Sequence, residues 1–472
     1  MQENEKRLGE EKISKLLISF AFPAFIGMMV ISTYSIIDRI FVGRVVGPMA
    51  ISGIAVTFPI SLLMMAFGML IGIGAGARIS IYLGQKKREE AQLVLGNAFS
   101  LLLIIATIIS LCGLIFLNPI LQLFGASPEV FPYAQQFISI ILGGAFFQFI
   151  AFGLNGAISA EGNPKVAMQT MLLSAFLNIV LLVVFIYILH WGIRGSALAT
   201  VISQFISSLW VLAHFRGKKS NLKLTLANMK LNKKIVFQIL IIGIAPFTLQ
   251  LGASIVVVVL NIVLAKYGGD IAIAAMGVIY SVTFFMIVPI IALTQGAQPI
   301  IGYNYGAKNF SRVKQTLKLA IIIASLISIG TFMLVEIFPH YIIHFFSKDQ
   351  ELVRLGSSGL RYYLLMLPVI GFQIVAANFF LAIGNGPKSM VLNLLRQVVI
   401  LIPALLILPH FFGLQGIWIA GPLSDGLAAT VTGIFLYYEL KHLDEKHEKT
   451  LSNLAEKTNT KSAYTLPETT VV

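Results

Sequence analysis

Charged side chains are scarce in this sequence, where Asp, Glu, Lys and Arg together make up only 11% of 472 residues. Soluble domains carry about 25% charged residues, and this chain is instead 57% hydrophobic. Apolar runs of the roughly 20 residues that a membrane helix needs recur along its whole length. The alternating pattern of a transmembrane barrel is missing. The sequence therefore predicts an all-α polytopic membrane protein.

Three further absences narrow the class of protein. Cysteine occurs once, as Cys112, so the chain has no internal disulfide. The hydrophilic N-terminal segment lacks the apolar core and cleavage site of a signal peptide, so the first apolar helix is expected to remain in place. The net charge of +14 lies in loops rather than on a basic face with interleaved aromatics, so no nucleic-acid partner is predicted.

The apolar runs predict twelve transmembrane helices. Several are longer than a bilayer requires, which indicates tilted helices or protruding ends. Their approximate limits are 15–38, 49–83, 92–117, 132–160, 166–189, 194–214, 235–266, 271–303, 314–338, 357–384, 389–409 and 413–439.

Loop charge predicts the orientation of these helices. Lysine and arginine gather at 86–88, 216–234 and 308–314, whereas the other connections hold few basic residues and some acids. Because basic loops stay in the cytoplasm, both termini are expected there and the protein in the cell (inner) membrane.

These features divide the chain into five segments. Two six-helix bundles are expected at 15–215 and 235–440, joined by a basic cytoplasmic linker at 216–234. A cytoplasmic segment at 1–14 precedes them. The tail at 441–472 is rich in Lys, Glu and Thr without apolar periodicity, so it is expected to be disordered.

The two halves repeat each other in sequence. The matched places are Pro23 with Pro246, Asp38 with Asn261, Gly74…Gly84 with Gly296…Gly306, EGNPK (161–165) with GNGPK (384–388), and WGIRGSALATVISQ (191–204) with FGLQGIWIAGPLSD (412–425). Six spans per half is an even number, so both halves enter the membrane in the same sense. A parallel pseudo-two-fold repeat of this kind is typical of alternating-access carriers with a site between the halves.

The first apolar run carries a proline near its start and an acid near its end. Pro23 removes one hydrogen bond from the helix and predicts a bend. An acid at or near membrane depth is costly, so Asp38 is a candidate functional residue. The alternative is that Asp38 lies in the headgroup region and pairs with Arg39 or Arg44.

At these residues the sequence resembles the multidrug and toxic compound extrusion (MATE) transporters, in the bacterial branch that includes the MepA and DinF-type exporters. The resemblance covers residues 10–440 approximately. It depends on the first helix from Pro23 to DRIFVG, on GAGARISIYLG, on the Gly-Asn-Pro-Lys and Gly-Pro-Lys loops, and on the Gly-x-x-Gly starts of spans six and twelve.

The resemblance implies a cation or proton site made of Asp38, Asn178 and Thr200. The family pattern places a second acid one turn after Asn178, where this chain has Leu182. A sodium ion prefers several oxygen ligands and a proton needs one carboxylate, so proton coupling is favoured over sodium coupling. Asn178 could instead make only an interhelical hydrogen bond, and Thr200 could bond back to its own helix.

Other side chains at plausible membrane depth are candidates for a substrate cavity: Tyr34, Gln148, Asn155, Asn261, Tyr280 and Met286. Gln148 and Asn155 are two turns apart and are expected to share a face, with plain helix packing as the alternative. Asp425 is a second intramembrane acid, either part of a drug or proton site or paired with Arg396. Glu161, in a loop, is expected to be solvated.

The sequence and the resemblance together predict a monomeric secondary antiporter that exports amphipathic, often cationic drugs or toxic compounds in exchange for H+ or Na+ by alternating access. Its partners would be small organic molecules and the bilayer, with no cofactor and no metal. A flippase for a lipid-linked precursor is the alternative, although it would want a basic cavity for a diphosphate. An intramembrane enzyme would need clustered catalytic residues, which the sequence lacks, and a channel would not need this duplicated design.

Overall fold

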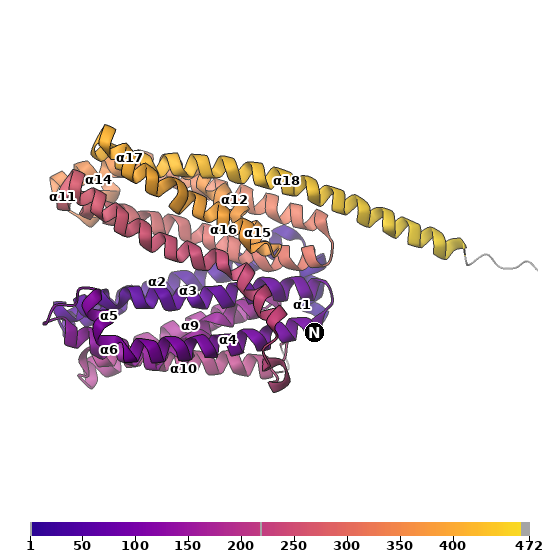
Figure 1. The fold of residues 1–472 in the computed structure, drawn as a ribbon, viewed down its shortest axis with the longest axis horizontal. Helices are drawn as coiled ribbons and strands as arrows, with labels where there is room; N and C mark the ends of the chain where they lie inside the picture. The colour runs from indigo at the N-terminus through magenta and orange to yellow at the C-terminus, as the bar shows by residue number, and fades with distance from the viewer. Residues whose placement is uncertain (1, 218–219, 464–472) are drawn as a thin grey trace, which may run out of the picture.

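The computed structural model describes residues 2–217 and 220–463, and nearly all of these residues are helical, with no strand among them (Figure 1). The elements up to the linker are α1 (Gln2–Glu10), α2 (Ile13–Val45), α3 (Pro48–Gly84), α4 (Arg88–Ile115), α5 (Leu117–Leu123), α6 (Phe131–Gly143), α7 (Ala145–Gly153), α8 (Asn155–Ala160), α9 (Pro164–Leu182), η1 (Val183–Ile188) and α10 (Gly192–Arg216). Those that follow are η2 (Leu226–Met229), α11 (Lys233–Gly306), α12 (Phe310–Ile337), α13 (Pro339–Phe346), α14 (Gln350–Tyr363), α15 (Leu367–Ala382), α16 (Gly386–Leu394), η3 (Leu395–Ile400), α17 (Leu401–Phe412) and α18 (Leu414–Ala463).

Twelve membrane crossings follow from these helices. Within the described residues nine helices are long and apolar enough to cross a membrane, and two bent pairs, α6 with 145–160 and α14 with α15, add one broken span each. The 74 residues of α11 would extend about 110 Å, over three times the bilayer core, so α11 holds two crossings. Its backbone leaves helical geometry between them, at Gly269 (φ 62°, ψ −164°). The predicted fold class is confirmed.

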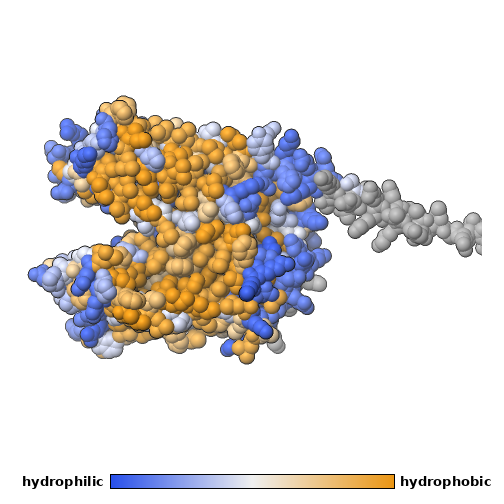
Figure 2. All heavy atoms as spheres, viewed as in Figure 1, coloured by the Kyte–Doolittle hydropathy of each residue, from blue (hydrophilic) through white to orange (hydrophobic). Residues whose placement is uncertain are grey.

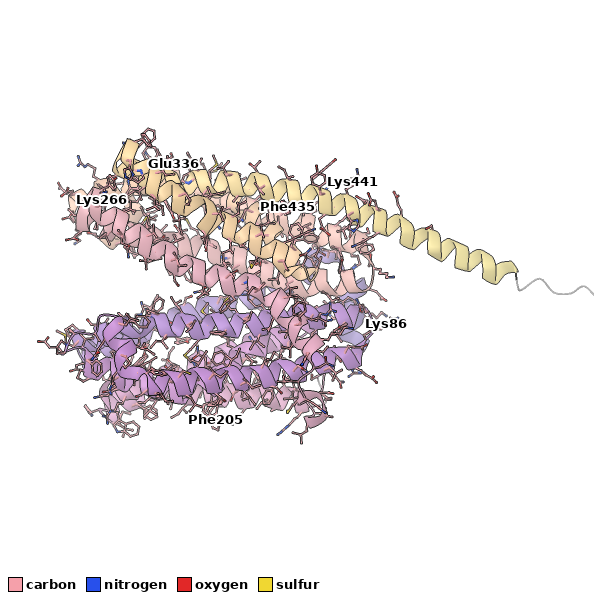
Figure 3. The ribbon with its side chains drawn as sticks, viewed as in Figure 1. Lys86, Phe205, Lys266, Glu336, Phe435 and Lys441 are labelled. Atoms are coloured by element: carbon pink, nitrogen blue, oxygen red, sulfur yellow. The ribbon has the colours of Figure 1, made fainter. Side chains whose placement is uncertain are left out.

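Apolar side chains cover the middle of the molecule and polar ones its ends (Figure 2). Phe205 and Phe435 project from the middle, each more than a third exposed, as expected of side chains that face lipid (Figure 3). Lys86 and Lys441 lie at the end that also holds the N-terminus, here called the basic end. The opposite end carries Lys266 and Glu336.

Each half of the chain has its own apolar core, and a cleft separates the halves on the side away from the basic end (Figure 2). Side chains of α3, α4, α6 and α10 form one core, and those of α11, α12, α15 and α18 form the other. Leu8 of α1 and Leu16 and Phe20 of α2 belong to the second core. Val42 of α2 belongs to the first core, so the first membrane helix, α2, bridges the two bundles.

The halves meet where glycines let two helix backbones touch. A Cβ on Gly84 of α3 would overlap the backbone of Tyr303 on α11, and one on Gly306 of α11 would overlap the backbone of Ile81 on α3. Gly84 and Gly306 are matched positions of the sequence repeat. The same close contact is therefore made twice, once from each half, near the basic end.

The segment before the first span packs under the C-terminal half. Arg312 Nη2 donates to the carbonyl oxygens of Leu8 (3.3 Å), in the last turn of α1, and of Glu11 (2.7 Å), directly after α1. Asn304 Nδ2 also donates to the Leu8 carbonyl, at 3.0 Å. The unpaired carbonyls at the end of a helix are thus satisfied by side chains of the opposite bundle.

The C-terminal tail differs from its predicted disorder. Helix α18 continues to Ala463, so residues 441–463 are helical, and residues 464–472 lie outside the described residues. Leu443 is fully buried, and Asp444 forms an ion pair with Lys314 of α12. These two contacts hold the first turns of the extension against the C-terminal bundle.

The solvated position predicted for Glu161 is wrong, because the side chain is fully buried. Its Oε2 accepts hydrogen bonds from Ser220 Oγ (2.7 Å), Asn221 N (3.0 Å) and Leu222 N (3.3 Å), all in the linker between the halves. Its Oε1 lies 2.5 Å from His214 Nε2. Glu161 thus ties the linker to the N-terminal bundle.

Replacing Glu161 with Gln is expected to lower the free energy of unfolding by about 2–4 kcal/mol, because charge-assisted bonds are lost and buried donors are left without an acceptor. Thermal and denaturant unfolding in detergent would measure the loss. Glu129→Gln is the matched control, since Glu129 is exposed. Equal stability of the two variants would contradict this account of Glu161.

Candidate functional site

Helix α10 positions the predicted coupling residues through two hydroxyls one turn apart. Ser196 Oγ donates to Asp38 Oδ1 of α2 at 2.8 Å. One turn further along α10, Thr200 Oγ1 accepts from Asn178 Nδ2 of α9 at 3.1 Å. Residues four apart on a helix share a face, so Asp38 and Asn178 lie beside one strip of α10. The structure thus brings all three predicted residues to one place.

The carboxylate of Asp38 has no cationic partner within 4 Å among the residues that the structure describes, so pairing with Arg39 or Arg44 is not observed. Asp38 is half-buried and lies seven residues, about 10 Å, inside the end of α2 at Val45. A carboxylate at this depth with one hydroxyl donor is poorly compensated for the loss of water. It is therefore well placed to take up a cation or a proton.

Asn178 completes the group with an oxygen that is still free. The side chain is 1% exposed, and its Oδ1 has no hydrogen-bond partner in the described part of the chain. One turn later Leu182 is fully buried in the apolar core, and the π-helical segment η1 begins directly after it. The site thus offers one carboxylate, one amide oxygen and two hydroxyls.

The predicted cavity residues are more widely spread. Tyr34 lies one turn before Asp38 on α2, Gln148 is half-buried on α7, and Asn155 is buried on α8 with its Oδ1 unpartnered. A break at Leu154 separates Gln148 from Asn155, so they do not share one continuous helix face. No hydrogen bond among the described residues joins either of them to Asp38.

The predicted cavity residues of the second half all lie on α11. Asn261 is exposed, while Tyr280 and Met286 are half-buried. The ring of Tyr280 lies 6.3 Å from that of Tyr363, centroid to centroid. These side chains are therefore remote from the Asp38 group in the chain and in their contacts.

Asp425 is paired with Arg396, as one of the two alternatives for this acid predicted. Its Oδ1 lies 2.6 Å from Arg396 Nε, and both side chains are mostly buried. An acid that already holds a guanidinium has less need of a proton or a metal cation than an unpaired one. The structure therefore separates Asp425 from Asp38 in its chemistry.

Pro23 is buried in the middle of a helix that remains unbroken from Ile13 to Val45. Its ring leaves one carbonyl of the preceding turn without an intrahelical donor. The bend expected at Pro23 stays a prediction, because the conformation described here keeps the helix continuous.

Sequence reasoning missed Ser196, which donates to the candidate acid. The signal that could have found it is its position four residues before Thr200, on the same helix face. Arg396 was considered as a partner of Asp425, but nothing in the sequence placed Tyr363 beside them.

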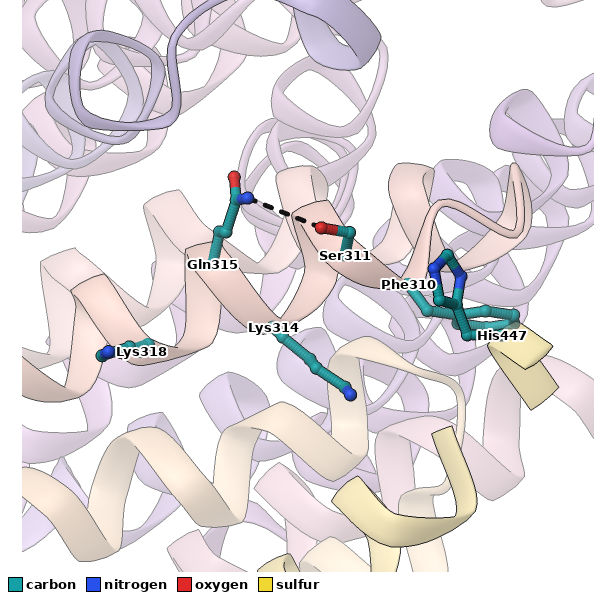
Figure 4. A pocket seen from close by; sticks show the side chains of 6 residues that line it. All are labelled: Phe310, Ser311, Lys314, Gln315, Lys318 and His447. Atoms are coloured by element: carbon teal, nitrogen blue, oxygen red, sulfur yellow. Dashed lines mark hydrogen bonds between the residues drawn. The ribbon is translucent and has the colours of Figure 1, made fainter. Parts of the chain in front are cut away.

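A cavity of about 250 Å³ lies elsewhere, at the basic end between α12 and α18 (Figure 4). Phe310, Ser311, Lys314, Gln315, Lys318 and His447 line it. It contains none of the predicted site residues. The described residues also contain no group of three or more His, Cys, Asp or Glu side chains that could hold a metal ion.

Comparison with known proteins adds the family and its relatives. The MatE family model matches residues 23–184 and 246–406, one match in each half. The chain is 30% identical over 433 residues to the multidrug export protein MepA of Staphylococcus haemolyticus, covering 92% of this chain and 95% of the relative. It is 28% identical over 427 residues to MepA of Staphylococcus aureus, covering 90% and 94%.

Solved structures match over the same length. The MATE multidrug transporter DinF-BH, solved in complex with rhodamine 6G, is 37% identical, with a TM-score of 0.85 over 92% of this chain and 97% of that chain. A MATE structure described as the bent conformation is 27% identical, with a TM-score of 0.89 over 94% and 99%. An outward-facing MATE family transporter is 27% identical, with a TM-score of 0.87 over 93% and 98%.

The Asn178–Thr200 contact can be tested by Thr200→Val, which keeps the shape of the side chain and removes its hydroxyl. We expect the free energy of unfolding to fall by about 1 kcal/mol, because the buried amide of Asn178 loses its partner. Thr170→Val is the control, since Thr170 is buried on α9 but bonds only to its own helix, at the Val166 carbonyl. An equal loss in both variants would show that the interhelical contact adds no stability.

Proposed function

The chain belongs to the MatE family of multidrug efflux transporters, and on that premise we propose that it is an antiporter which exports amphipathic, often cationic compounds in exchange for protons. Its curated relatives are named as exporters rather than as enzymes. The chain is embedded in a membrane by its apolar helices. The coupling ion, the substrates and the transport cycle are the proposed part.

One observation carries the proposal: Asp38 is an intramembrane carboxylate with a hydroxyl donor and, among the described residues, no cationic side chain within 4 Å. The other acid near the bilayer midplane, Asp425, is held by Arg396. An acid within the membrane that is held by no ion pair can bind a proton from one side and release it to the other. Asp38 is the residue that we assign to this role.

The set of oxygen ligands supports a proton rather than a sodium ion. A site for a metal cation gains affinity from several oxygen ligands and from their negative charge. Here Leu182 occupies the place of a second acid, which leaves Asp38, the free Oδ1 of Asn178 and the hydroxyls of Ser196 and Thr200. One negative charge suffices for a proton and makes a weaker cage for sodium.

Alternating access would use the cleft between the halves. If the basic end is cytoplasmic, as the loop charges favour, the described conformation has its cleft open to the outside (Figure 2). Protonation of Asp38 would then favour bending of α2 at Pro23 and release of the substrate. A bound proton or substrate shifts this equilibrium only by its different affinity for the two conformations.

The substrate class follows from the chemistry of the spans. Aromatic and methionine side chains such as Tyr34, Tyr280 and Met286 are adaptable and suit many ligands rather than one. A structural relative was solved with the dye rhodamine 6G in place. We therefore place aromatic, positively charged amphiphiles first among the substrates of this chain.

The remaining assignments complete the proposal. The protein acts as a monomer in the cell membrane with both termini in the cytoplasm, and it needs neither a cofactor nor a nucleic-acid partner. A flippase for a lipid-linked precursor is less well supported, because positively charged residues are few within the apolar spans. A diphosphate headgroup would require uncompensated positive charge.

The first test is dye efflux in proteoliposomes under an imposed proton gradient, comparing the wild type with Asp38→Asn. Asparagine keeps the shape and cannot carry the proton, so gradient-driven export of rhodamine 6G should fall by about tenfold or more. Asp270→Asn is the control, because Asp270 is exposed next to the break in α11. Undiminished export by Asp38→Asn would remove Asp38 from the coupling mechanism.

The second test restores the missing acid with Leu182→Asp. Sodium chloride at about ten times the dissociation constant should then stabilise the variant by about 1.4 kcal/mol relative to choline chloride, and leave the wild type unchanged. Thermal unfolding measures both effects, and Leu182→Asn controls for the polar group in an apolar core. Stabilisation of the wild type by sodium would speak for sodium coupling instead.

A further inference from the structure

The C-terminal half contains a polar cluster that the coupling mechanism does not use. Arg396 of η3 and Asp425 of α18 form its centre, with 2.6 Å between Nε and Oδ1. Arg396 is ten residues from the start of α16 at Gly386, and Asp425 is eleven residues from the start of α18 at Leu414. Both positions are therefore about 15 Å along the helix axis from a helix start, well inside the apolar spans.

The cluster faces the interior of the bundle rather than lipid. Of the exposed apolar side chains on α18, Leu423 (42%), Leu427 (48%) and Ile434 (52%) lie about 160–180° around the helix from Asp425, whereas Ile419 lies about 120° and Phe435 about 80° away. The side chain of Asp425 is 11% exposed and that of Arg396 is 21% exposed. The pair is thus turned away from lipid while the guanidinium keeps some open surface.

The guanidinium has unused hydrogen-bonding capacity. Of its five N–H donors, only Nε–H has an acceptor among the described residues. Arginine buried at membrane depth with bare Nη groups is costly, and a structural ion pair would do as well or better if replaced by apolar side chains. The free Nη edge is the edge with which arginine binds a carboxylate through two parallel bonds.

Local structure fixes the direction of this guanidinium. Ser424 Oγ donates to the backbone carbonyl of Arg396, which ties the π-helical segment η3 to α18 directly beside Asp425. π-helical turns in long helices occur frequently at functional sites. The side chain of Arg396 is therefore held at both its backbone and its Nε.

Two tyrosines supply an aromatic wall next to the pair. The ring of Tyr363 lies against α18 at Gly421, one turn before Asp425, where an added Cβ would come within 2.9 Å of Cε2. Tyr280 lies 6.3 Å from Tyr363, edge to face. Side chains of α11, α14, η3 and α18 thus meet in one place.

We propose that this cluster is a second ligand site, specific for aromatic amphiphiles that carry a carboxylate. The Nη edge of Arg396 binds the carboxylate, and Tyr280 and Tyr363 pack against the aromatic ring. Asp425 orients the guanidinium through Nε and competes electrostatically with the ligand. The inference rests on the proposed export function and assigns the place at which the carboxylate of such a compound binds.

A matched pair of dyes tests the site: rhodamine 6G, an ester with a positive charge, and its free acid, which has the same ring system and an added carboxylate. Equilibrium binding to the detergent-purified protein is measured by fluorescence polarisation. Arg396→Gln should weaken binding of the free acid by about tenfold or more, the scale of a charge-assisted contact, and change binding of the ester by less than about twofold. Arg361→Gln, at an exposed arginine of α14, is the control.

Asp425→Asn gives the decisive contrast, because it should strengthen binding of the free acid by about threefold or more as the competing charge is removed. A pair that only braces the bundle predicts that both variants weaken both dyes alike, and that result would overturn the proposal. If Arg396→Gln fails to fold, Arg396→Gln/Asp425→Asn leaves no unpaired charge and must still lose the preference for the free acid.

No ion gradient is present in this binding assay, so its result is separable from that of the coupling experiment. Asp38→Asn should keep the wild-type ratio of free-acid to ester affinity even if it abolishes gradient-driven export. If Asp38→Asn changed the ratio of free-acid to ester affinity and Arg396→Gln did not, carboxylate recognition would lie in the N-terminal half. That result would contradict the proposal.

Discussion

The close approach of α3 and α11 near the basic end is the contact on which the arrangement of the two bundles depends. Gly84 and Gly306 allow backbone to lie against backbone, and any side chain there would drive the helices apart. Within a bilayer the hydrophobic effect does not push helices together, so tight packing of small residues supplies the attraction. The bundles are thus joined at the basic end and separate towards the other (Figure 2). A carrier that opens its basic end would have to loosen this contact.

The bilayer also makes each of the few intramembrane charges energetically costly. Each buried charge must be compensated, and the two halves do this differently. Within the described part of the chain, Asp38 accepts one side-chain hydrogen bond, from Ser196, whereas Asp425 has the guanidinium of Arg396. The two sequence-related halves thus hold one acid without an ion pair within 4 Å and one acid paired with arginine. This asymmetry is what we expect of a carrier in which one half couples to protons and both contribute to substrate recognition.

Much of the fold could be predicted because each membrane helix is specified by its own stretch of sequence. Each needs about 20 apolar residues, and the twelve predicted runs correspond to the twelve crossings of the structure. The group around Asn178 and Thr200 could be predicted from the resemblance. Ser196 shares the helix face of Thr200, which the sequence shows, but its contact with Asp38 depends on the spacing between α2 and α10. Glu161 was misplaced because a loop position implies solvent only when no other segment covers it, and here the linker does so.

The sequence by itself determined the membrane class, the span count, the duplicated halves and the family, because these follow from composition, run length and matched motifs along the chain. Only the tertiary structure decided which charges are paired. Arg396 and Asp425 are 29 residues apart, and Asp38 and Ser196 are 158 apart. Whether such side chains meet depends on the packing of whole helices. The physical reason is that the burial and hydrogen bonds of a side chain depend on its neighbours in three dimensions. Those neighbours come from helices that are distant in the chain.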